Sequence, residues 1–106
     1  MTKAKTSPKA KPDTVIVTWE HVRFRVRCTR DYLIKGTNHI ELLVIRPKSE
    51  PLPITETGYL SHFVTDGSIR TAKEAAAFFL DWIDREAKTK RWQRLDQQRR
   101  QLDLFS

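Results

Sequence analysis

The sequence predicts an α+β fold, in which a three-stranded antiparallel sheet is followed by one long C-terminal helix. Two patterns predict it. Apolar residues alternate with polar ones over residues 15–28, 39–46 and 58–64, the period of half-buried strands. From residue 71 onward, apolar residues recur at helical spacing instead. With 106 residues, of which 39% are hydrophobic, the chain has the length of one domain.

The first expected strand runs from Val15 to Cys28. Its apolar phase slips at Glu20-His21, which predicts a bulge or bend at that point. Beyond the slip the strand has an apolar face and a cationic face, because side chains alternate across a strand. The apolar face is formed by Val22, Phe24, Val26 and Cys28, and the cationic face by Arg23, Arg25 and Arg27.

Two further strands are expected after a turn at Lys35–Asn38. The strand His39–Arg46 is apolar on both faces over Leu42–Ile45, which is typical of a central strand. Three prolines then predict an extended loop before the third, shorter strand, Gly58–Val64.

The helix is expected to begin at Thr71, whose hydroxyl can cap the third helical amide while Glu74 reaches back to the cap. The apolar stripe that follows suits a helix lying across a sheet. After Ala87 the apolar residues fall on a different face, so we expect the helix to lose tertiary contact near residue 90. The two stripes are Ala75, Phe79, Trp82 and Ile83, and then Trp92, Leu95 and Leu102.

These elements divide the chain into three parts. Residues 1–13 are predicted to be a disordered basic tail, 14–90 a single α+β domain, and 91–106 a basic helical extension with a C-terminal peptide motif. A core of this size is marginal, which makes a homodimer conceivable. The single cysteine, the lack of a long apolar run and the lysine-rich start predict a cytoplasmic protein without a membrane partner.

The net charge of +7 lies at the ends: +3 in residues 1–13, +4 in 85–106, and zero between. This layout predicts that the tails engage DNA phosphates without reading sequence. Trp92, among cations, could stack on an exposed base. The arginines of the first strand, about 7 Å apart, could also contact phosphates, or could simply protect an exposed sheet face from aggregation. The candidate DNA contacts are Lys3, Lys5, Lys9, Lys11, Lys88, Lys90, Arg91, Trp92 and Arg94, with Arg23, Arg25 and Arg27.

The most specific motif is the peptide Gln101-Leu102-Asp103-Leu104-Phe105. It resembles, at all five positions, the sliding-clamp-binding motif of bacterial polymerases, mismatch-repair factors and replication regulators. The resemblance implies that Leu104 and Phe105 enter an apolar pocket of the clamp, Leu102 rests on its rim, and Gln101 donates and accepts hydrogen bonds. Alternatively, the apolar residues fold back onto the domain or extend the stripe begun at Trp92.

We therefore expect a non-enzymatic accessory protein of DNA replication or repair, or of a mobile element, that docks on the bacterial DNA sliding clamp. The stretch Pro51–Phe63 resembles segments of short uncharacterised plasmid and integrating-element proteins. The alternative is a small basic DNA-binding regulatory module without a clamp partner. No pattern suggests a catalytic site or a cofactor, and a metal site at His39, Glu41 and His62 is a third hypothesis.

Overall fold

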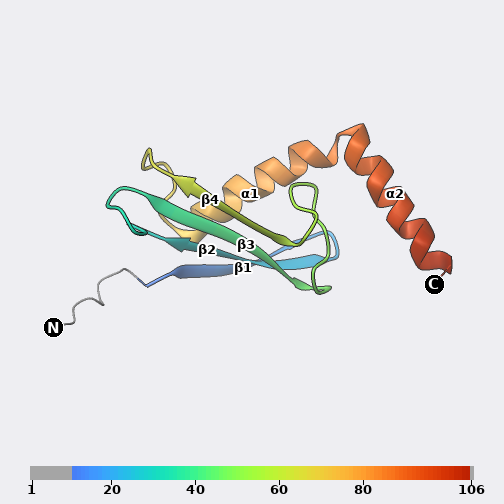
Figure 1. The fold of residues 1–106 in the computed structure, drawn as a ribbon, viewed down its shortest axis with the longest axis horizontal. Helices are drawn as coiled ribbons and strands as arrows, with labels where there is room; N and C mark the ends of the chain where they lie inside the picture. Colours follow the sequence, from blue (N-terminus) through green and yellow to red (C-terminus); the bar gives the residue numbers. More distant parts are fainter. Residues whose placement is uncertain (1–10, 106) are drawn as a thin grey trace.

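The computed structural model describes residues 11–105, with side chains as far as Leu102. This part of the chain forms a four-stranded antiparallel sheet in the order β1-β2-β3-β4, followed by two helices (Figure 1). The α+β class is confirmed, but the predicted counts of three strands and one helix are wrong. The elements are β1 (Asp13–Trp19), β2 (Val22–Thr29), β3 (Asn38–Arg46), β4 (Tyr59–Val64), α1 (Ala72–Ala87) and α2 (Lys90–Phe105).

The extra strand comes from a hairpin at Glu20-His21. The predicted strand 15–28 is in fact β1 and β2, which pair antiparallel as far as Trp19 opposite Val22. A two-residue turn shifts the apolar phase in the same way as a bulge does. The slip in the sequence alone therefore does not distinguish a hairpin turn from a bulge. Glu20 adopts a positive φ of 53° without the glycine or asparagine that usually marks such a turn. The sequence therefore lacked the signal that distinguishes a hairpin from a bend.

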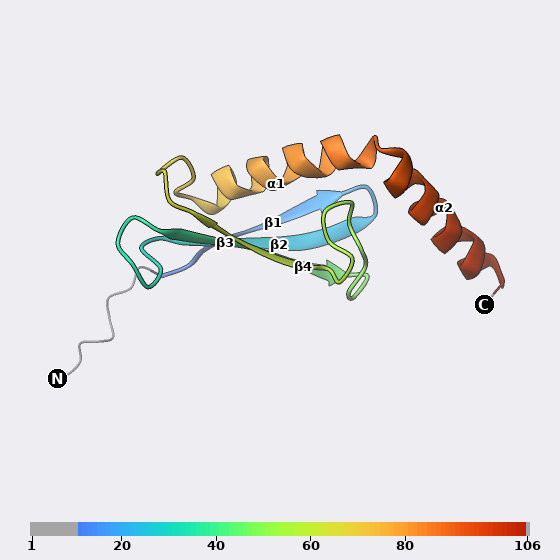
Figure 2. The ribbon, with the colours of Figure 1, turned by 45° about the horizontal axis from the view of Figure 1, so that its top comes forward.

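Helix α1 lies across one face of the sheet, as Figure 2 shows. The core forms where Phe24 and Leu42 of the sheet meet Phe79 and Ile83 of the helix, all fully buried. Cys28 is buried in the same core, as its apolar phase predicts, and burial raises the pKa of its thiol.

The other face of the sheet is open. β3 is a central strand, as predicted, but its second apolar phase is not covered: Leu43 and Ile45 are 37% and 42% exposed. Ile16 of β1 is exposed on the same face. The chain thus places an apolar strip in the middle of a solvent-facing sheet.

The helical region breaks at Lys88-Thr89. The Thr89 hydroxyl donates to the Glu86 carbonyl (2.7 Å) and accepts from the Trp92 amide (3.2 Å), so it closes α1 and caps α2. Contrary to the prediction, the helix keeps tertiary contact after residue 90. Arg91 pairs with Glu56 (3.1 Å), and Arg99 pairs with Glu50.

The start of α1 is fixed by two caps. Thr71 accepts from the Glu74 amide (3.0 Å) as predicted, although the Glu74 carboxylate accepts from Arg70 rather than from the cap residue. Asp13, expected in the tail, instead begins β1 and accepts from the Ala72 amide (2.7 Å). Within residues 11–105, no helix is long and apolar enough to cross a membrane.

Candidate nucleic-acid interface

The open sheet face combines arginines, apolar residues and aromatic rings. Its composition follows from the strand register, in which residues directly opposite each other share a face. One row crosses all four strands and consists of Ile16, Arg25, Leu43 and Tyr59. The predicted cationic face of β2 is therefore the centre of a broader mixed surface.

The arginines of β2 differ in how they are paired. Arg27 Nη1 lies 3.8 Å from Glu41 Oε1, and its Nε is buried with no hydrogen-bond acceptor. Arg23 and Arg25 have no ion-pair partner within the part of the chain that the structure describes. Two guanidinium groups on this face are thus available to an anionic ligand.

Tyr59 is held in place by the same network. Its phenol donates to Glu41 Oε2 at 2.8 Å, and Glu41 is in turn held by Arg27. The hydrogen bond to Glu41, together with partial burial and the carboxylate charge, raises the pKa of the Tyr59 phenol. The Tyr59 side chain is nevertheless 45% exposed, so a fixed ring lies open at the surface.

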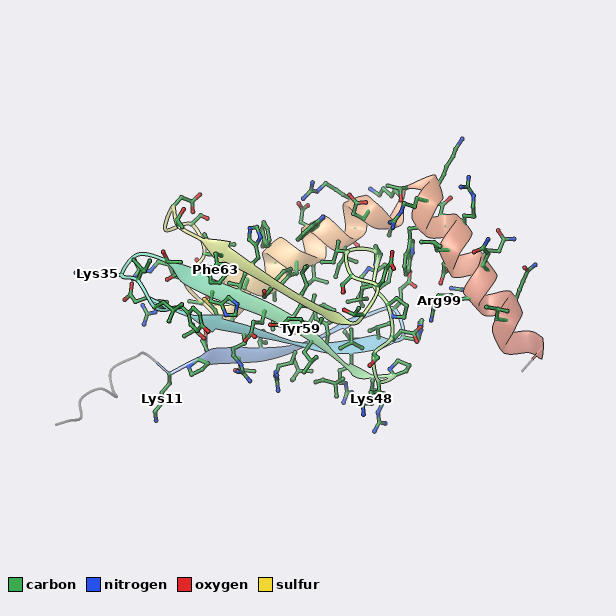
Figure 3. All side chains as sticks on the ribbon, viewed as in Figure 1. Lys11, Lys35, Lys48, Tyr59, Phe63 and Arg99 are labelled. Atoms are coloured by element: carbon green, nitrogen blue, oxygen red, sulfur yellow. The ribbon has the colours of Figure 1, made fainter. Side chains whose placement is uncertain are left out.

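A second aromatic group lies further along the same face. The His39 ring stacks on Tyr32 (centroids 4.6 Å apart) and contacts Phe63 (4.8 Å). Phe63 is 52% exposed, whereas His39 is almost fully buried between its neighbours. Figure 3 labels Phe63 and Tyr59, which come from the same strand, β4.

The geometry rules against the metal site considered from the sequence. His39 and Glu41 lie on the open face, but His62 pairs with Ile40, on the helix-covered side, and stacks on Phe78 of α1 (5.6 Å). No group of three potential ligands that could hold a metal occurs among the described residues. His62 does not approach His39 and Glu41, because side chains alternate along β4 and His62 and Phe63 point to opposite faces of the sheet.

Acidic and basic residues are segregated between the two faces. Within the strands, the open face carries one carboxylate, Glu41, beside four arginines, Arg23, Arg25, Arg27 and Arg46. Helix α1, on the other face, carries four acidic residues and two basic ones, so the helix itself has an acidic excess. The net charge of residues 14–84 is zero, but the charges are unevenly distributed, and the open sheet face is basic.

Among the described residues, the predicted DNA contacts in the tails are on Lys11 and around the junction of the two helices. Lys11 is exposed beside β1, while Lys3, Lys5 and Lys9 lie outside the described residues. Around the helix junction, Trp92 is half-buried and lines a groove with Pro51, Leu95 and Leu102, so it faces the β3–β4 loop. The exposed cations there are Lys88, Lys90, Arg91 and Arg94, of which Arg91 is paired with Glu56.

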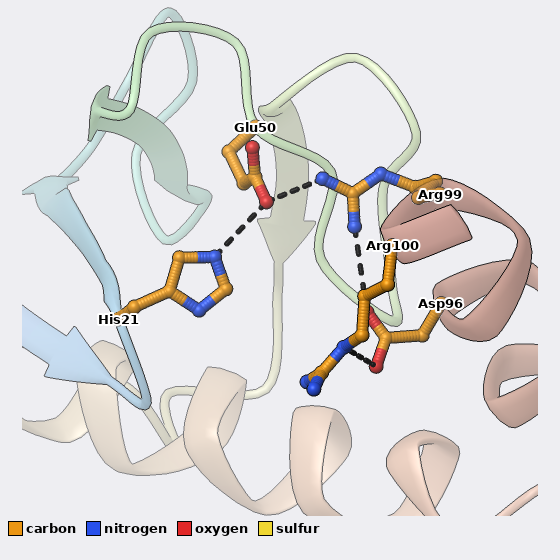
Figure 4. A network of polar contacts seen from close by, with 5 residues as sticks. All are labelled: His21, Glu50, Asp96, Arg99 and Arg100. Atoms are coloured by element: carbon orange, nitrogen blue, oxygen red, sulfur yellow. Dashed lines mark hydrogen bonds and ion pairs between the residues drawn. The ribbon is translucent and has the colours of Figure 1, made fainter. Parts of the chain in front are cut away.

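Helix α2 is held against the sheet end by Glu50, as Figure 4 shows. The Glu50 carboxylate contacts His21 Nε2 (3.0 Å) and Arg99, and Asp96 pairs with Arg99 (3.4 Å) and Arg100 (3.1 Å). Partial burial alone would raise the pKa of Glu50, but hydrogen bonds from His21 and Arg99 and their charges hold it below its usual range.

The C-terminal peptide forms the last turns of α2. The backbone is helical through Phe105, and Leu102 is 69% exposed. The side chains of Asp103, Leu104 and Phe105 lie outside the described residues. In both views α2 projects beyond the end of the sheet (Figures 1 and 2). Gln101 and Leu102, near its end, are both exposed.

Sequence reasoning missed three aromatic residues of the open face, Tyr32, Tyr59 and Phe63. The signal for two of them was present: Tyr59, Ser61 and Phe63 occupy one phase of the last strand, and Leu60, His62 and Val64 the other. What was lacking was the knowledge of which phase faces the helix. Tyr32 lies in the β2–β3 loop, where no periodicity applies.

Together, the fold and this surface define a class of protein: a small α+β domain in which a helix covers one face of an antiparallel sheet and leaves the other face open. The chain belongs to the family of the KlcB third domain, whose family model matches residues 12–92. None of the curated proteins or solved structures matches it.

Proposed function

We propose that this protein is a non-enzymatic accessory factor of bacterial DNA replication or repair, or of a mobile element. In this proposal it docks on the DNA sliding clamp through Gln101–Phe105 and holds nearby DNA with its basic groups. The observation that carries the proposal is the five-residue resemblance of this peptide to clamp-binding motifs, at the projecting end of α2. The peptide lies outside the residues that the family model matches, so its role is additional to that of the domain.

The placement of α2 is compatible with docking. Groove-bound peptides of this kind are extended, whereas residues 101–105 are helical here, so docking includes unwinding the last turns of α2. Unwinding a helix end costs little, because its last carbonyls have no partner within the helix. Arg99 holds α2 to Glu50 just before the peptide, so the peptide can unwind while the rest of the helix stays in place.

The direct test is binding of the full-length protein to purified bacterial sliding clamp, in the absence of DNA. We expect a Kd in the micromolar range that rises at least a hundredfold in the Leu104→Ala/Phe105→Ala variant. Each apolar side chain contributes about 1.5–3 kcal/mol when buried in the groove, which accounts for a loss of this size.

A matched control replaces two other apolar residues that are exposed. Leu33 and Ile34 lie in the β2–β3 loop with exposed fractions of 80% and 67%. The Leu33→Ala/Ile34→Ala variant should bind the clamp as tightly as the unmodified protein. Equal losses in both double variants would mean that apolar surface in general, rather than the peptide, sustains the interaction.

A second candidate function is a basic DNA-binding regulatory module without a clamp partner. The observation that favours it is the pair of unpaired arginines, Arg23 and Arg25, on the open face. This alternative predicts salt-sensitive DNA binding that survives deletion of residues 101–106, together with no association between the intact protein and the clamp.

A further inference from the structure

We propose that the open sheet face binds single-stranded nucleic acid, with phosphates on Arg23 and Arg25 of β2 and bases stacked on Tyr59 and Phe63 of β4. This deepens the proposed function and rests on its claim that the protein contacts DNA. It assigns that contact to the sheet rather than to the tails, and it names the form of nucleic acid that is bound.

The strand register forms two parallel lines of side chains. Arg23 and Arg25 follow β2 with a spacing of about 7 Å, comparable with the separation of neighbouring phosphates along an extended strand. Tyr59 and Phe63 follow β4, and Tyr59 lies in the same row as Arg25. The two lines are separated by β3, a distance of about 10 Å. Because arginine side chains are long, one nucleotide can place its phosphate on β2 and its base on β4.

The apolar strip between the two lines suits the same ligand. Leu43 and Ile45 of β3 lie exposed there, where nucleotide sugars and base edges can cover them. The one carboxylate on the face, Glu41, is held between Arg27 and the Tyr59 phenol. Its charge is therefore compensated before a phosphate arrives.

The rings favour a single strand over a duplex. A base offers its flat surface to an aromatic side chain only when it is unpaired and unstacked. In duplex DNA the bases present only their edges, in a major groove about 12 Å wide. The sheet, four strands and about 15 Å across, does not fit into that groove.

Both rings are held before the ligand binds. Tyr59 is fixed by its hydrogen bond to Glu41, and Phe63 rests against His39, which stacks on Tyr32. Side chains that are already ordered lose little entropy on binding. Each stacked base is expected to contribute to the binding free energy as bases do on other aromatic side chains, because Tyr59 and Phe63 are each about half exposed.

The test measures fluorescence anisotropy of a labelled strand of about 12 nucleotides, and of the same sequence as a duplex, with the full-length protein. We expect the single strand to bind at least tenfold more tightly. The Tyr59→Leu/Phe63→Leu variant keeps the apolar area but removes the rings, and should weaken strand binding at least tenfold. The Tyr59→Trp/Phe63→Trp variant keeps stacking surfaces and should retain binding. Quenching of 2-aminopurine fluorescence in the strand should be strong with the unmodified protein and the tryptophan variant and weak with the leucine variant.

The arginines are tested by salt dependence. Removing two phosphate contacts in the Arg23→Gln/Arg25→Gln variant should reduce the slope of log K against log salt by about 1.4. The matched control is Lys73→Gln/Arg85→Gln, which removes two cations from the exposed side of α1 and should leave the slope unchanged.

Three outcomes would overturn the inference. If strand and duplex bind equally and the sheet variants have no effect, DNA association stands but takes place through the tails. If the protein binds no nucleic acid and forms a dimer that Leu43→Glu dissociates, a second copy covers the face. If neither nucleic acid nor clamp is bound, the proposed function fails as well, because the clamp test contains no DNA.

Discussion

Gly58 fixes the path of the chain between β3 and β4. Its φ is +82°, and a Cβ built there would lie 3.1 Å from Ser49 Cα and 3.2 Å from the Ser49 carbonyl carbon. Its own carbonyl accepts from the Val44 amide at 2.7 Å, which joins the loop to β3. The position therefore requires glycine for both its backbone conformation and its space.

Replacing Gly58 by alanine should lower the free energy of unfolding by about 2–3 kcal/mol, because it adds crowding to an unfavourable φ. Gly36→Ala is the matched control, since Gly36 also has a positive φ (+88°) but no atom within 4 Å of its built Cβ. That variant should cost only about 1 kcal/mol. Urea unfolding measures the stability of both variants. An equal loss of stability in the two would mean that crowding against Ser49 does not contribute.

Glu50 gives the protein a pH-dependent contact between α2 and the sheet end. Since its pKa is lowered in the folded protein, the ionised carboxylate stabilises the fold. This stabilisation is complete above the ordinary value of 4.5 and is lost as the pH falls through the lowered pKa. Below that range the carboxyl is neutral and no longer pairs with Arg99.

The Glu50→Gln variant should therefore be less stable by about 1–2 kcal/mol at pH 7, and should equal the unmodified protein in strongly acidic solution. Unfolding by urea at a series of pH values measures the difference. Glu56→Gln is the control, because Glu56 pairs with Arg91 at an exposed site and should contribute less than about 0.5 kcal/mol. A difference for Glu50→Gln that does not change with pH would exclude the ion pair as its cause.

At the scale of elements, the start of α1 depends on a strand distant in sequence. Asp13 of β1 and Thr71 each accept a backbone amide of the first turn. Because the first amides of a helix have no partner within it, these two side chains supply what the helix lacks. The first strand and the helix are thus joined by a cap as well as by the core.

Removing either cap should lower the free energy of unfolding by about 1 kcal/mol, in Asp13→Ala and in Thr71→Ala. Asp13→Asn should recover most of the loss, since the amide oxygen can still accept from Ala72. Asp66→Ala serves as the control, because its carboxylate accepts only from Ser68 within its own loop. Thermal unfolding followed by circular dichroism measures all four variants. An Asp13→Ala variant as stable as the unmodified protein would show that the contact does not stabilise the fold.

At the scale of the whole molecule, charge is separated twice. It is separated along the chain, with the excess of basic residues in the terminal segments. It is separated again in space, because the strands direct Arg23, Arg25 and Arg27 to the open face while α1 carries an acidic excess. The proposed contacts with the clamp and with single strands therefore use different surfaces of one molecule, the end of α2 and the open sheet face, and each can be removed without the other.

The sequence by itself determined the α+β class, the central position of β3, the cap at Thr71 and the burial of Cys28. These follow from local periodicity and capping chemistry, which act over a few residues. The C-terminal resemblance is also a property of five adjacent residues, and its consequence stays a prediction.

Only the tertiary structure decided that Glu20-His21 is a hairpin, that Thr89 divides the helical region, and that α2 returns to Glu50. It also decided which phase of each strand is left open, and so brought Arg25, Leu43 and Tyr59 into one row. The physical reason is that alternation defines two faces of a strand but does not choose between them. That choice is made by where the helix packs, and the residues on the uncovered face then become the candidate site.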